Sequence, residues 1–308
     1  MSSVKEDKKW NMKLLKQNIK VLVILCLGFI YNGYAQIASA EKDVLLDLYN
    51  ELEGNNWNQK WNIQEPVANW HGVEISGTHV VGLDLFRNNL KGQLPESINK
   101  LNKLRYLNLA FNGLEGELPS TITDLSHLIV LKLEMNKLDG TLPTEIGKLR
   151  NLKEFTIFNN FISGTIPESL GKIKNLKILN LSSNKFEGAI PGSLGNLTKL
   201  ESLGLFENGL KGAIPSQIGN LTKLKELVLA NNEFNGEIPM EVGQLASLEI
   251  FQIQNNKFDS FKSLEQFSSR ELLVFDYDKE EEDKIDFKET NFNKSRMADT
   301  KFEDDDNE

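Results

Sequence analysis

Residues 104–127 read LRYLNLAFNGLEGELPSTITDLSH, and the same pattern recurs at a constant spacing along most of the chain. Its most regular element is an asparagine that returns every 24 residues. This asparagine ladder consists of Asn88, Asn112, Asn136, Asn160, Asn184, Asn208, Asn232 and Asn256. Units that repeat at a fixed period stack on one another, so the pattern predicts a solenoid, which is usually a binding surface and rarely an enzyme.

Each repeated column has a physical reason, which the quoted unit illustrates. Leu107 and Leu109 are separated by one residue, which predicts a short strand with both side chains on one face. Strands of successive units are expected to pair in parallel, about 4.8 Å apart. Asn112 follows the strand, where its amide can satisfy backbone groups of the turn; stacked asparagines could also bond one another. Gly116 permits the backbone dihedral angles of the next bend, and Pro119 fixes φ at its own position.

The remaining apolar residues, such as Ile98 and Leu101, have helical spacing and are expected to fill the core from the other side. A leucine-rich helical array is excluded, because all units but the last contain both a glycine and a proline. The motif L-x-x-L-x-L-x-x-N-x-L-x-G-x-[IL]-P-x-x-[IL]-x-x-L resembles the plant-type leucine-rich repeat from Val80 to about Leu264. The resemblance implies an α/β solenoid: a right-handed superhelix of about eight 24-residue coils over 80–264, with a parallel β-sheet on its concave face.

The segment 36–79 is expected to form a helical N-terminal cap. EKDVLLDLYNELEG, residues 41–54, spaces its apolar residues helically, and Trp57, Trp61 and Trp70 follow. The segment is similar to the cap of plant-type repeats but lacks that cap's cysteine pair. It thereby resembles secreted bacterial leucine-rich repeat proteins of Bacteroidetes type. Because the open end of a solenoid must be covered, we interpret the tryptophans as cap core rather than as a ligand site.

The N-terminal 35 residues have the pattern of a secretory signal peptide. Residues 12–35 read MKLLKQNIKVLVILCLGFIYNGYA, with a basic start, a short apolar run and small residues at its end. Met12 is a possible true start of translation. The apolar run is shorter than the ~20 residues of a spanning helix, so cleavage is favoured over a retained anchor, and no membrane span is expected afterwards. The one cysteine, Cys26, lies in this segment, which leaves no disulfide in the processed protein.

The C-terminal end departs from the repeat. Residues 265–278 are expected to form a C-terminal cap, in which ELLVFDYD, residues 271–278, is a last strand or a cover for the sheet edge. Residues 279–308 form an acidic tail, and residues 276–308 hold 14 acidic and 6 basic residues. Such a composition favours disorder.

The sequence shows little that indicates catalysis. Its three histidines, His71, His79 and His127, have no nucleophile and carboxylate at a familiar spacing, and there is no phosphate loop, dinucleotide fingerprint or metal-ligand pair. We therefore expect no enzyme activity, catalytic residue, metal or cofactor. The net charge of −9 disfavours nucleic acid as a partner.

Function is expected to depend on the irregular positions around the strands, whose side chains point outward from the sheet. Phenylalanines and a methionine there are expected to form a broken apolar stripe, with charged residues and a tyrosine beside it. The candidate ligand-binding residues are Phe86, Arg87, Tyr106, Phe111, Glu134, Met135, Phe158, Phe206 and Glu207. Exposed aromatics on a sheet indicate a partner site. The alternative is that they only stabilise the strands, where aromatic side chains are favoured.

The leading hypothesis is a secreted, non-enzymatic, monomeric protein that binds a protein, peptide or glycan through its concave face. Two alternatives remain open: a component of a cell-surface receptor or adhesin, and an inhibitor of an extracellular polysaccharide-degrading enzyme. All three place the protein outside the cytoplasm, in the medium, at the cell surface or in a periplasm. The ligand itself is not identified, because repeat scaffolds are reused for many ligands.

Overall fold

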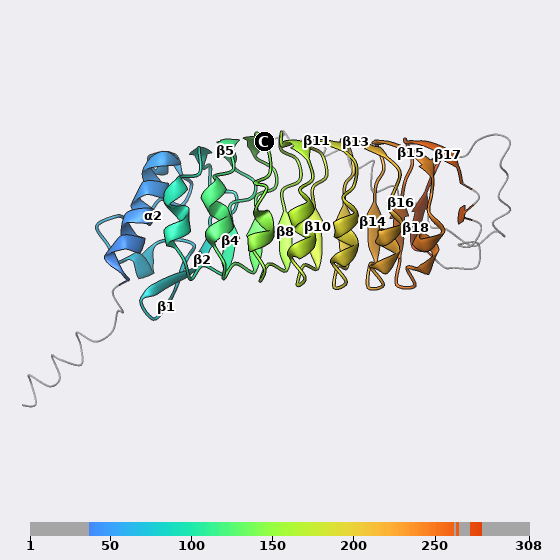
Figure 1. The fold of residues 1–308 in the computed structure, drawn as a ribbon. Helices are drawn as coiled ribbons and strands as arrows, with labels where there is room; N and C mark the ends of the chain where they lie inside the picture. The colour runs from blue at the N-terminus through green and yellow to red at the C-terminus, as the bar shows by residue number, and fades with distance from the viewer. Residues whose placement is uncertain (1–36, 262, 265–271, 279–308) are drawn as a thin grey trace, which may run out of the picture.

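The structure, a computed structural model, describes residues 37–261, 263–264 and 272–278. The expected signal peptide, the acidic tail and part of the expected C-terminal cap lie outside the described residues. Across the part that is described, no helix combines the length and apolarity needed to cross a membrane. The described chain is an elongated stack of similar coils (Figure 1).

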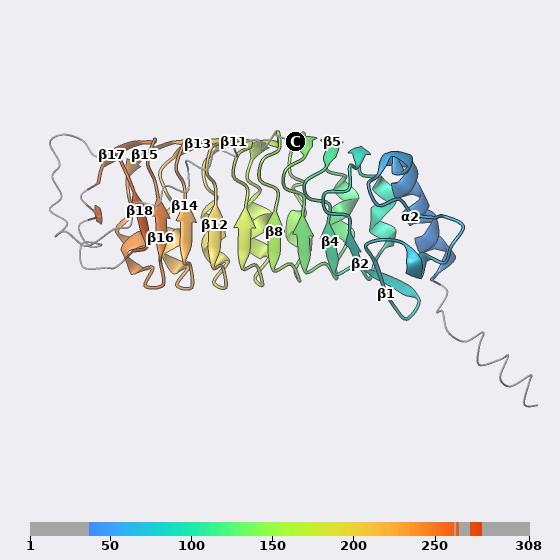
Figure 2. The ribbon, with the colours of Figure 1, turned by 180° about the vertical axis from the view of Figure 1, so that it is seen from behind.

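One long sheet runs through the stack, and Figure 2 shows its strands side by side. The strand order is β1-β2-β4-β6-β8-β10-β12-β14-β16-β18, so each coil contributes the next strand. All neighbours pair in parallel except β1 and β2, which are antiparallel. The strands are β1 (Val73–Ser76), β2 (His79–Asp84), β4 (Tyr106–Asn108), β6 (Val130–Lys132), β8 (Glu154–Thr156), β10 (Ile178–Asn180), β12 (Ser202–Gly204), β14 (Glu226–Val228), β16 (Ile250–Gln252) and β18 (Val274–Asp276).

The parallel register follows the 24-residue period: Leu107 pairs with Leu83 on one side and Leu131 on the other. The paired leucines are fully buried, as the strand pattern predicts. β18 pairs in parallel with β16, so ELLVFDYD contributes a last strand rather than only a cover. Its neighbour Asp278 then accepts hydrogen bonds from the backbone N–H groups of Asn255 and Asn256, at 2.9 and 3.3 Å.

The ladder asparagines bond to the backbone of two coils. Asn136 Nδ2 donates to the carbonyls of Leu109, Leu133 and Glu134 at 3.0–3.3 Å. Its Oδ1 accepts the backbone N–H of Leu114 at 3.0 Å. One amide therefore satisfies four backbone groups where the strand turns inward, which is the role expected from its position. The direct bonds between stacked asparagine side chains that we considered are replaced by these backbone contacts.

Two smaller sheets, which the sequence pattern did not predict, follow the ladder asparagines. They lie along the upper edge in Figure 1. One has three strands, β3 (Lys91–Gly92), β5 (Gly113–Glu117) and β7 (Lys137–Asp139); the other has five, β9 (Ser163–Thr165), β11 (Lys185–Gly188), β13 (Gly209–Gly212), β15 (Glu233–Glu237) and β17 (Lys257–Ser260). A single bridge between Thr141 and Ser163 joins the two series.

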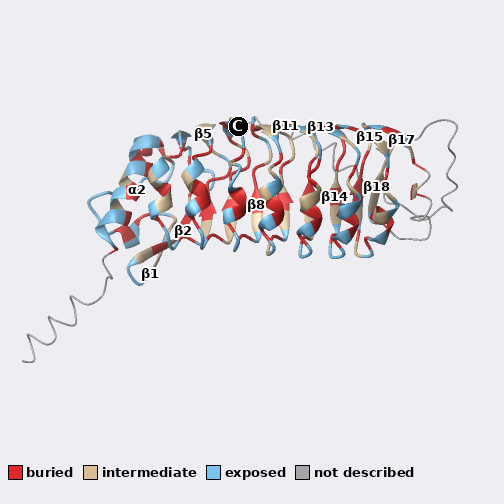
Figure 3. Cartoon of the chain, viewed as in Figure 1, coloured by how far each residue is buried: buried red, intermediate tan, exposed pale blue. Residues whose placement is uncertain are grey.

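Short 3₁₀-helices close each coil on the side opposite the long sheet. They are η3 (Glu96–Lys100), η4 (Ser120–Asp124), η5 (Ile146–Lys148), η6 (Glu168–Lys172), η7 (Gly192–Asn196), η8 (Ser216–Asn220) and η9 (Met240–Gln244). Most of them follow a proline in an extended conformation. Pro95, for example, directly precedes η3 and has fixed φ. Ile98 and Leu101 are fully buried, so the helically spaced residues do fill the core from this side. Figure 3 shows the resulting continuous buried interior.

The N-terminal end of the stack is covered by α2 (Ser39–Glu51), η1 (Gly54–Asn56) and η2 (Val67–Asn69). Trp57, Trp61 and Trp70 are 1–3% exposed. Trp61 stands edge-on to Trp57 and stacks on Trp70, with ring centroids 4.9 Å apart in both pairs. These rings belong to the hydrophobic core, as the interpretation of the cap requires. Glu41 of α2 accepts hydrogen bonds from His79 and the Val80 N–H, which ties the helix to the first coil.

Candidate functional site

The outward face of the long sheet, hereafter the sheet face, includes positions at and just after each strand. The residue before each ladder asparagine has a positive φ between 48° and 57°, at Arg87, Phe111, Met135, Asn159, Ser183, Glu207, Asn231 and Asn255. This left-handed conformation turns the chain inward, and it is uncommon for residues other than glycine and asparagine. The same turn fixes where the side chains at these positions are presented.

Phe86 and Phe111 form an exposed aromatic pair on the first two coils. Their side chains are 47% and 37% exposed. The two rings stand edge to face with centroids 5.2 Å apart. Phe86 lies two residues before its ladder asparagine, and Phe111 lies one residue before the next. The pair leaves a substantial apolar area in water, which a binding partner would remove.

Beside this pair lies a polar cluster around Asp84. Its carboxylate accepts hydrogen bonds from Asn108 Nδ2 at 3.0 Å and from the Tyr106 hydroxyl at 3.4 Å. Burial, and next the neighbouring Asp84 carboxylate, raises the pKa of Tyr106 above its usual value. Asp84 and Tyr106 also line a hollow of about 410 Å³.

The hollow is lined mostly by residues of β2 and of its two neighbours in the sheet, β1 and β4. Its walls are Gly72, Val73, Glu74, Gly82, Leu83, Asp84 and Tyr106. At Gly82 a side chain is absent, and an added Cβ would lie 2.7 Å from the Glu74 carboxylate. The hollow, the Asp84 cluster and the Phe86–Phe111 pair thus lie together at the N-terminal end of the sheet face.

The other predicted site residues on the middle coils are less accessible. Glu134 is only 9% exposed, and its Oε2 accepts a hydrogen bond from the Thr156 hydroxyl at 2.5 Å. Met135 is half-buried, with its sulfur 2.8 Å from Asn159 Nδ2. Lys132 and Glu154 form a salt bridge of 2.8 Å next to them. These side chains contact each other, so the middle of the sheet face offers fewer free groups than the sequence suggested.

Phe158 and Phe206 are half-buried, so they do not extend the exposed pair into a continuous stripe. Arg87 and Glu207 are exposed, but they lie on coils far apart along the stack. Glu207 accepts a hydrogen bond from the Ser183 hydroxyl at 2.7 Å. Of the nine predicted residues, Phe86, Arg87, Tyr106 and Phe111 therefore lie together on the first two coils, while the other five are distributed along the later ones.

The sheet face is acidic. Its carboxylates are Glu74, Asp84, Glu134, Glu154, Glu207, Glu226, Asp276 and Asp278, whereas its cations are Arg87 and Lys132. Some of the acids are hydrogen-bonded within the face, such as Glu226 to the Ser202 hydroxyl at 2.7 Å. The imbalance favours a partner that carries positive charge.

The sequence did not identify Asp84, Glu74 or the hollow as parts of a site. The sequence does contain a hairpin pattern that could have indicated them: residues 73–76 alternate in polarity, and a Gly-Thr pair separates them from β2. The hairpin brings Glu74 next to Gly82, and no residue spacing within the 24-residue repeat predicts that contact.

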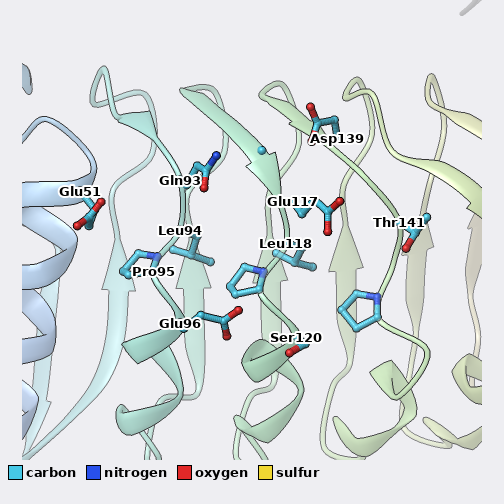
Figure 4. Close-up of a pocket in the computed structure, with 13 residues that line it drawn as sticks. Glu51, Gln93, Leu94, Pro95, Glu96, Glu117, Leu118, Ser120, Asp139 and Thr141 are labelled. Atoms are coloured by element: carbon cyan, nitrogen blue, oxygen red, sulfur yellow. The ribbon is translucent and has the colours of Figure 1, made fainter.

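A larger groove of about 800 Å³ lies on another side of the stack, between the strands that follow the ladder and the 3₁₀-helices (Figure 4). Glu51, Glu96, Glu117 and Asp139 are among its lining residues, as are Gln93 and Thr141. Within the described residues no group of three or more His, Cys, Asp or Glu side chains is arranged to hold a metal ion. The groove is open and polar and gathers no apolar anchor comparable with Phe86 and Phe111.

Family models match the repeats. The model described as Leucine-rich repeat region matches residues 83–214, and the model described as Leucine Rich Repeat matches residues 223–245. No curated protein matches the chain by sequence.

Among solved structures, the ectodomain of the Arabidopsis thaliana receptor kinase GASSHO1/SCHENGEN3 in complex with CASPARIAN STRIP INTEGRITY FACTOR 2 is 30% identical, with a TM-score of 0.70 over 76% of this chain and 30% of that chain. The Arabidopsis receptor kinase HAESA, in complex with the peptide hormone IDA and the co-receptor SERK1, is 31% identical, with a TM-score of 0.68 over 78% of this chain and 41% of that chain. A leucine-rich repeat protein of Leptospira interrogans is 33% identical, with a TM-score of 0.53 over 62% of this chain and 48% of that chain.

The chain spans about a third of the length of the plant receptor structures that it matches. The likeness covers 76–78% of this chain, and the parallel one-strand-per-coil sheet agrees with it. The chain folds as a leucine-rich repeat α/β solenoid.

Proposed function

We propose that this protein is a non-enzymatic binding protein that recognises a peptide or an extended protein segment on the N-terminal end of its sheet face. The observation that carries the proposal is the exposed Phe86–Phe111 pair beside the Asp84 cluster and its hollow. Aromatic anchors next to a pocket are the usual centres of protein interfaces. The complexes of similar plant receptors with peptide hormones support the same class of partner.

The ligand in this proposal has an apolar side chain and a positive charge close together. The apolar side chain packs on the Phe86 and Phe111 rings, and the charged group lies near Asp84 or Glu74. Arg87 and Tyr106 border the contact, and the later residues Glu134, Met135, Phe158, Phe206 and Glu207 would contact a longer ligand. The acidic sheet face accelerates association with such a ligand and disfavours acidic ones. A neutral glycan fits less well, because the face offers carboxylates more than neutral donors.

We also propose that the protein lies outside the cytoplasm and binds as a monomer. The signal-peptide pattern of residues 12–35 and the likeness to receptor ectodomains support a protein outside the cytoplasm, secreted or at a cell surface. A monomer suffices for binding, because the stack carries the whole candidate site on one chain.

The test begins with peptides selected from a random displayed library on the purified protein. The best peptides are then titrated calorimetrically into the wild type and into a Phe86→Ser, Phe111→Asn variant. Ser182 and Asn159 occupy the equivalent positions of other coils, so the substitutions suit the scaffold, and asparagine tolerates the positive φ. We expect the variant to bind at least about tenfold more weakly, because truncating interface anchors costs roughly 2 kcal/mol each.

Phe161→Ser is the matched control, since Phe161 is 48% exposed but follows a ladder asparagine instead of preceding one. The control should bind as the wild type does, and all variants should keep the same circular dichroism spectrum. Selected peptides that bind the Phe86→Ser, Phe111→Asn variant with unchanged affinity would refute the proposal.

A further inference from the structure

A second surface lies along one edge of the stack, away from the sheet face. It consists of the loops from the last residue of each 3₁₀-helix to the residue before the next long-sheet strand, and we call it the basic edge. In Figure 2 it is the lower edge, where the strand arrows begin. The loops are residues 100–105, 124–129, 148–153, 172–177, 196–201, 220–225 and 244–249.

The basic edge has the opposite charge to the whole chain. The chain has a net charge of −9, yet these loops carry twelve lysines and arginines against three acidic residues, Asp124, Glu201 and Glu249. All twelve cations are exposed: Lys100, Lys103, Arg105, Lys148, Arg150, Lys153, Lys172, Lys174, Lys177, Lys199, Lys223 and Lys225. Positive charge is therefore gathered on one edge.

The register of the coils places these cations in rows. The backbone N–H of Lys177 donates to the carbonyl of Lys153 at 2.8 Å, and that of Lys153 donates to Ile129 at 2.8 Å. Successive rows thus repeat at the strand spacing of about 4.8 Å. The adjacent loops 148–153 and 172–177 contribute six of the cations, so the charge is densest in the middle of the edge.

Most of these cations have no acidic partner within the described residues. The exceptions are Lys148, which pairs with Glu145, and Lys177, which pairs with Glu201. Lys174 and Lys199 donate to uncharged oxygens of Asn196 and Asn175. The hydrogen bond from Lys177, together with the charges of Lys225 and Lys223, lowers the pKa of Glu201. Stacked like charges repel one another in the free protein, and an anionic ligand relieves this repulsion.

The repeat does not require these lysines. The loop 196–201 reads NLTKLE and the loop 244–249 reads QLASLE, and both form the same turn with one cation or none. Thr198, Thr222 and Ala246 occupy the position of Arg150 and Lys174. The accumulation in particular coils is thus a property of the surface rather than of the fold.

We propose that the basic edge binds an acidic polysaccharide, a linear polymer whose sulfate or carboxylate groups recur along its length. The neighbouring loops 148–153 and 172–177 repeat their cations one strand spacing apart, and closely repeated cations fit such a chain. Single-stranded nucleic acid is disfavoured, because these loops contain no phenylalanine, tyrosine or tryptophan on which bases could stack. An anionic membrane is disfavoured, because proteins that lie on membranes insert apolar side chains, and none of the exposed large hydrophobic residues among those described is in these loops.

The two proposed sites are separate. The basic edge lies where the strands begin, whereas Phe86 and Phe111 follow the ends of their strands. A polysaccharide on the edge leaves the aromatic pair accessible to a peptide. The basic edge therefore has its own test.

The experiment measures binding of the purified protein to dextran sulfate at several salt concentrations around physiological ionic strength, with uncharged dextran as the reference polymer. An edge variant carries Arg150→Gln, Lys153→Gln and Lys174→Gln. We expect the edge variant to bind dextran sulfate at least about tenfold more weakly than the wild type. The slope of log K against the logarithm of the salt concentration should also be smaller in magnitude by about two, since each of the three lost ionic contacts lowers it by roughly 0.7. Uncharged dextran should not bind.

The matched control carries Lys91→Gln, Lys137→Gln and Lys211→Gln, which removes the same charge from exposed residues of β3, β7 and β13 on the opposite edge. It should bind dextran sulfate within about twofold of the wild type, and both variants should have unchanged circular dichroism. Equal weakening in the two variants, or none in the edge variant, would show that no specific edge site exists. Tighter binding to single-stranded DNA or to phosphatidylserine vesicles than to dextran sulfate would overturn the assignment of the ligand class.

Discussion

At the residue scale, the ladder asparagine is the side chain on which each coil depends. Asn160 and Asn184 repeat the contacts of Asn136: three carbonyls accept from each Nδ2, and an Oδ1 accepts a backbone N–H of the preceding coil. Leucine, although its side chain has the same number of heavy atoms and the same branching, has no polar atom and would leave all of these groups buried without partners. The recurrence of asparagine is therefore a requirement of backbone hydrogen bonding and carries no information about the ligand.

Asn136→Ala tests this requirement. Four backbone groups lose their partner and a small cavity opens, so we expect the free energy of unfolding to fall by about 2–4 kcal/mol in urea denaturation. Asn235→Ser, at an exposed position of β15 that is Ser163 three coils earlier in β9, is the control and should change stability by less than about 0.5 kcal/mol. Equal effects of the two substitutions would contradict the structural role of the ladder.

At the element scale, the antiparallel β1–β2 hairpin makes the N-terminal end of the sheet face different from the rest. The Gly72 carbonyl accepts the backbone N–H of Asp84 at 2.8 Å, which fixes the chain next to the site. Gly72 has φ +75°, and a Cβ on it would lie 1.9 Å from the Asp84 carbonyl oxygen. Only glycine fits there, so the position of Asp84 depends on this residue.

Gly72→Ala should therefore destabilise the protein by about 3 kcal/mol, the sum of left-handed strain and a steric clash. Gly77, in the turn of the same hairpin, has φ +61° but nothing within 4 Å of its missing Cβ. Gly77→Ala should cost only about 1 kcal/mol. Urea denaturation of both variants makes the comparison, and a Gly72→Ala variant no less stable than Gly77→Ala would be inconsistent with the close approach to Asp84.

The elements differ in how far the sequence predicts them. The long sheet follows from the period-two leucines and the 24-residue spacing, because burial of those leucines requires it. Strands such as β5, which reads GLEGE, have little intrinsic strand preference and form because stacked coils pair their backbones. The Phe86–Phe111 contact was not predicted as a pair, because it joins two different columns and depends on the left-handed turn at Phe111.

At the scale of the whole molecule, the solenoid separates surfaces of different chemistry. The sheet face is acidic with one exposed aromatic pair, and the edge where its strands begin is basic. A stack of coils makes this separation possible because each column of the repeat is presented along one side of the molecule. Two ligands of different charge can thus be bound without competition, as the two proposals require.

The central claim is that a peptide ligand covers the Phe86–Phe111 pair. Hydroxyl-radical footprinting of the protein with and without a library-selected peptide tests it most directly, since radicals oxidise exposed aromatic and methionine side chains. Phe161 and Met240, which are 48% and 72% exposed on other surfaces, serve as internal references. The account predicts that the peptide protects Phe86, Phe111 and Tyr106 while oxidation of the references is unchanged; protection of Phe161 or Met240 with Phe86 and Phe111 still fully oxidised would contradict it.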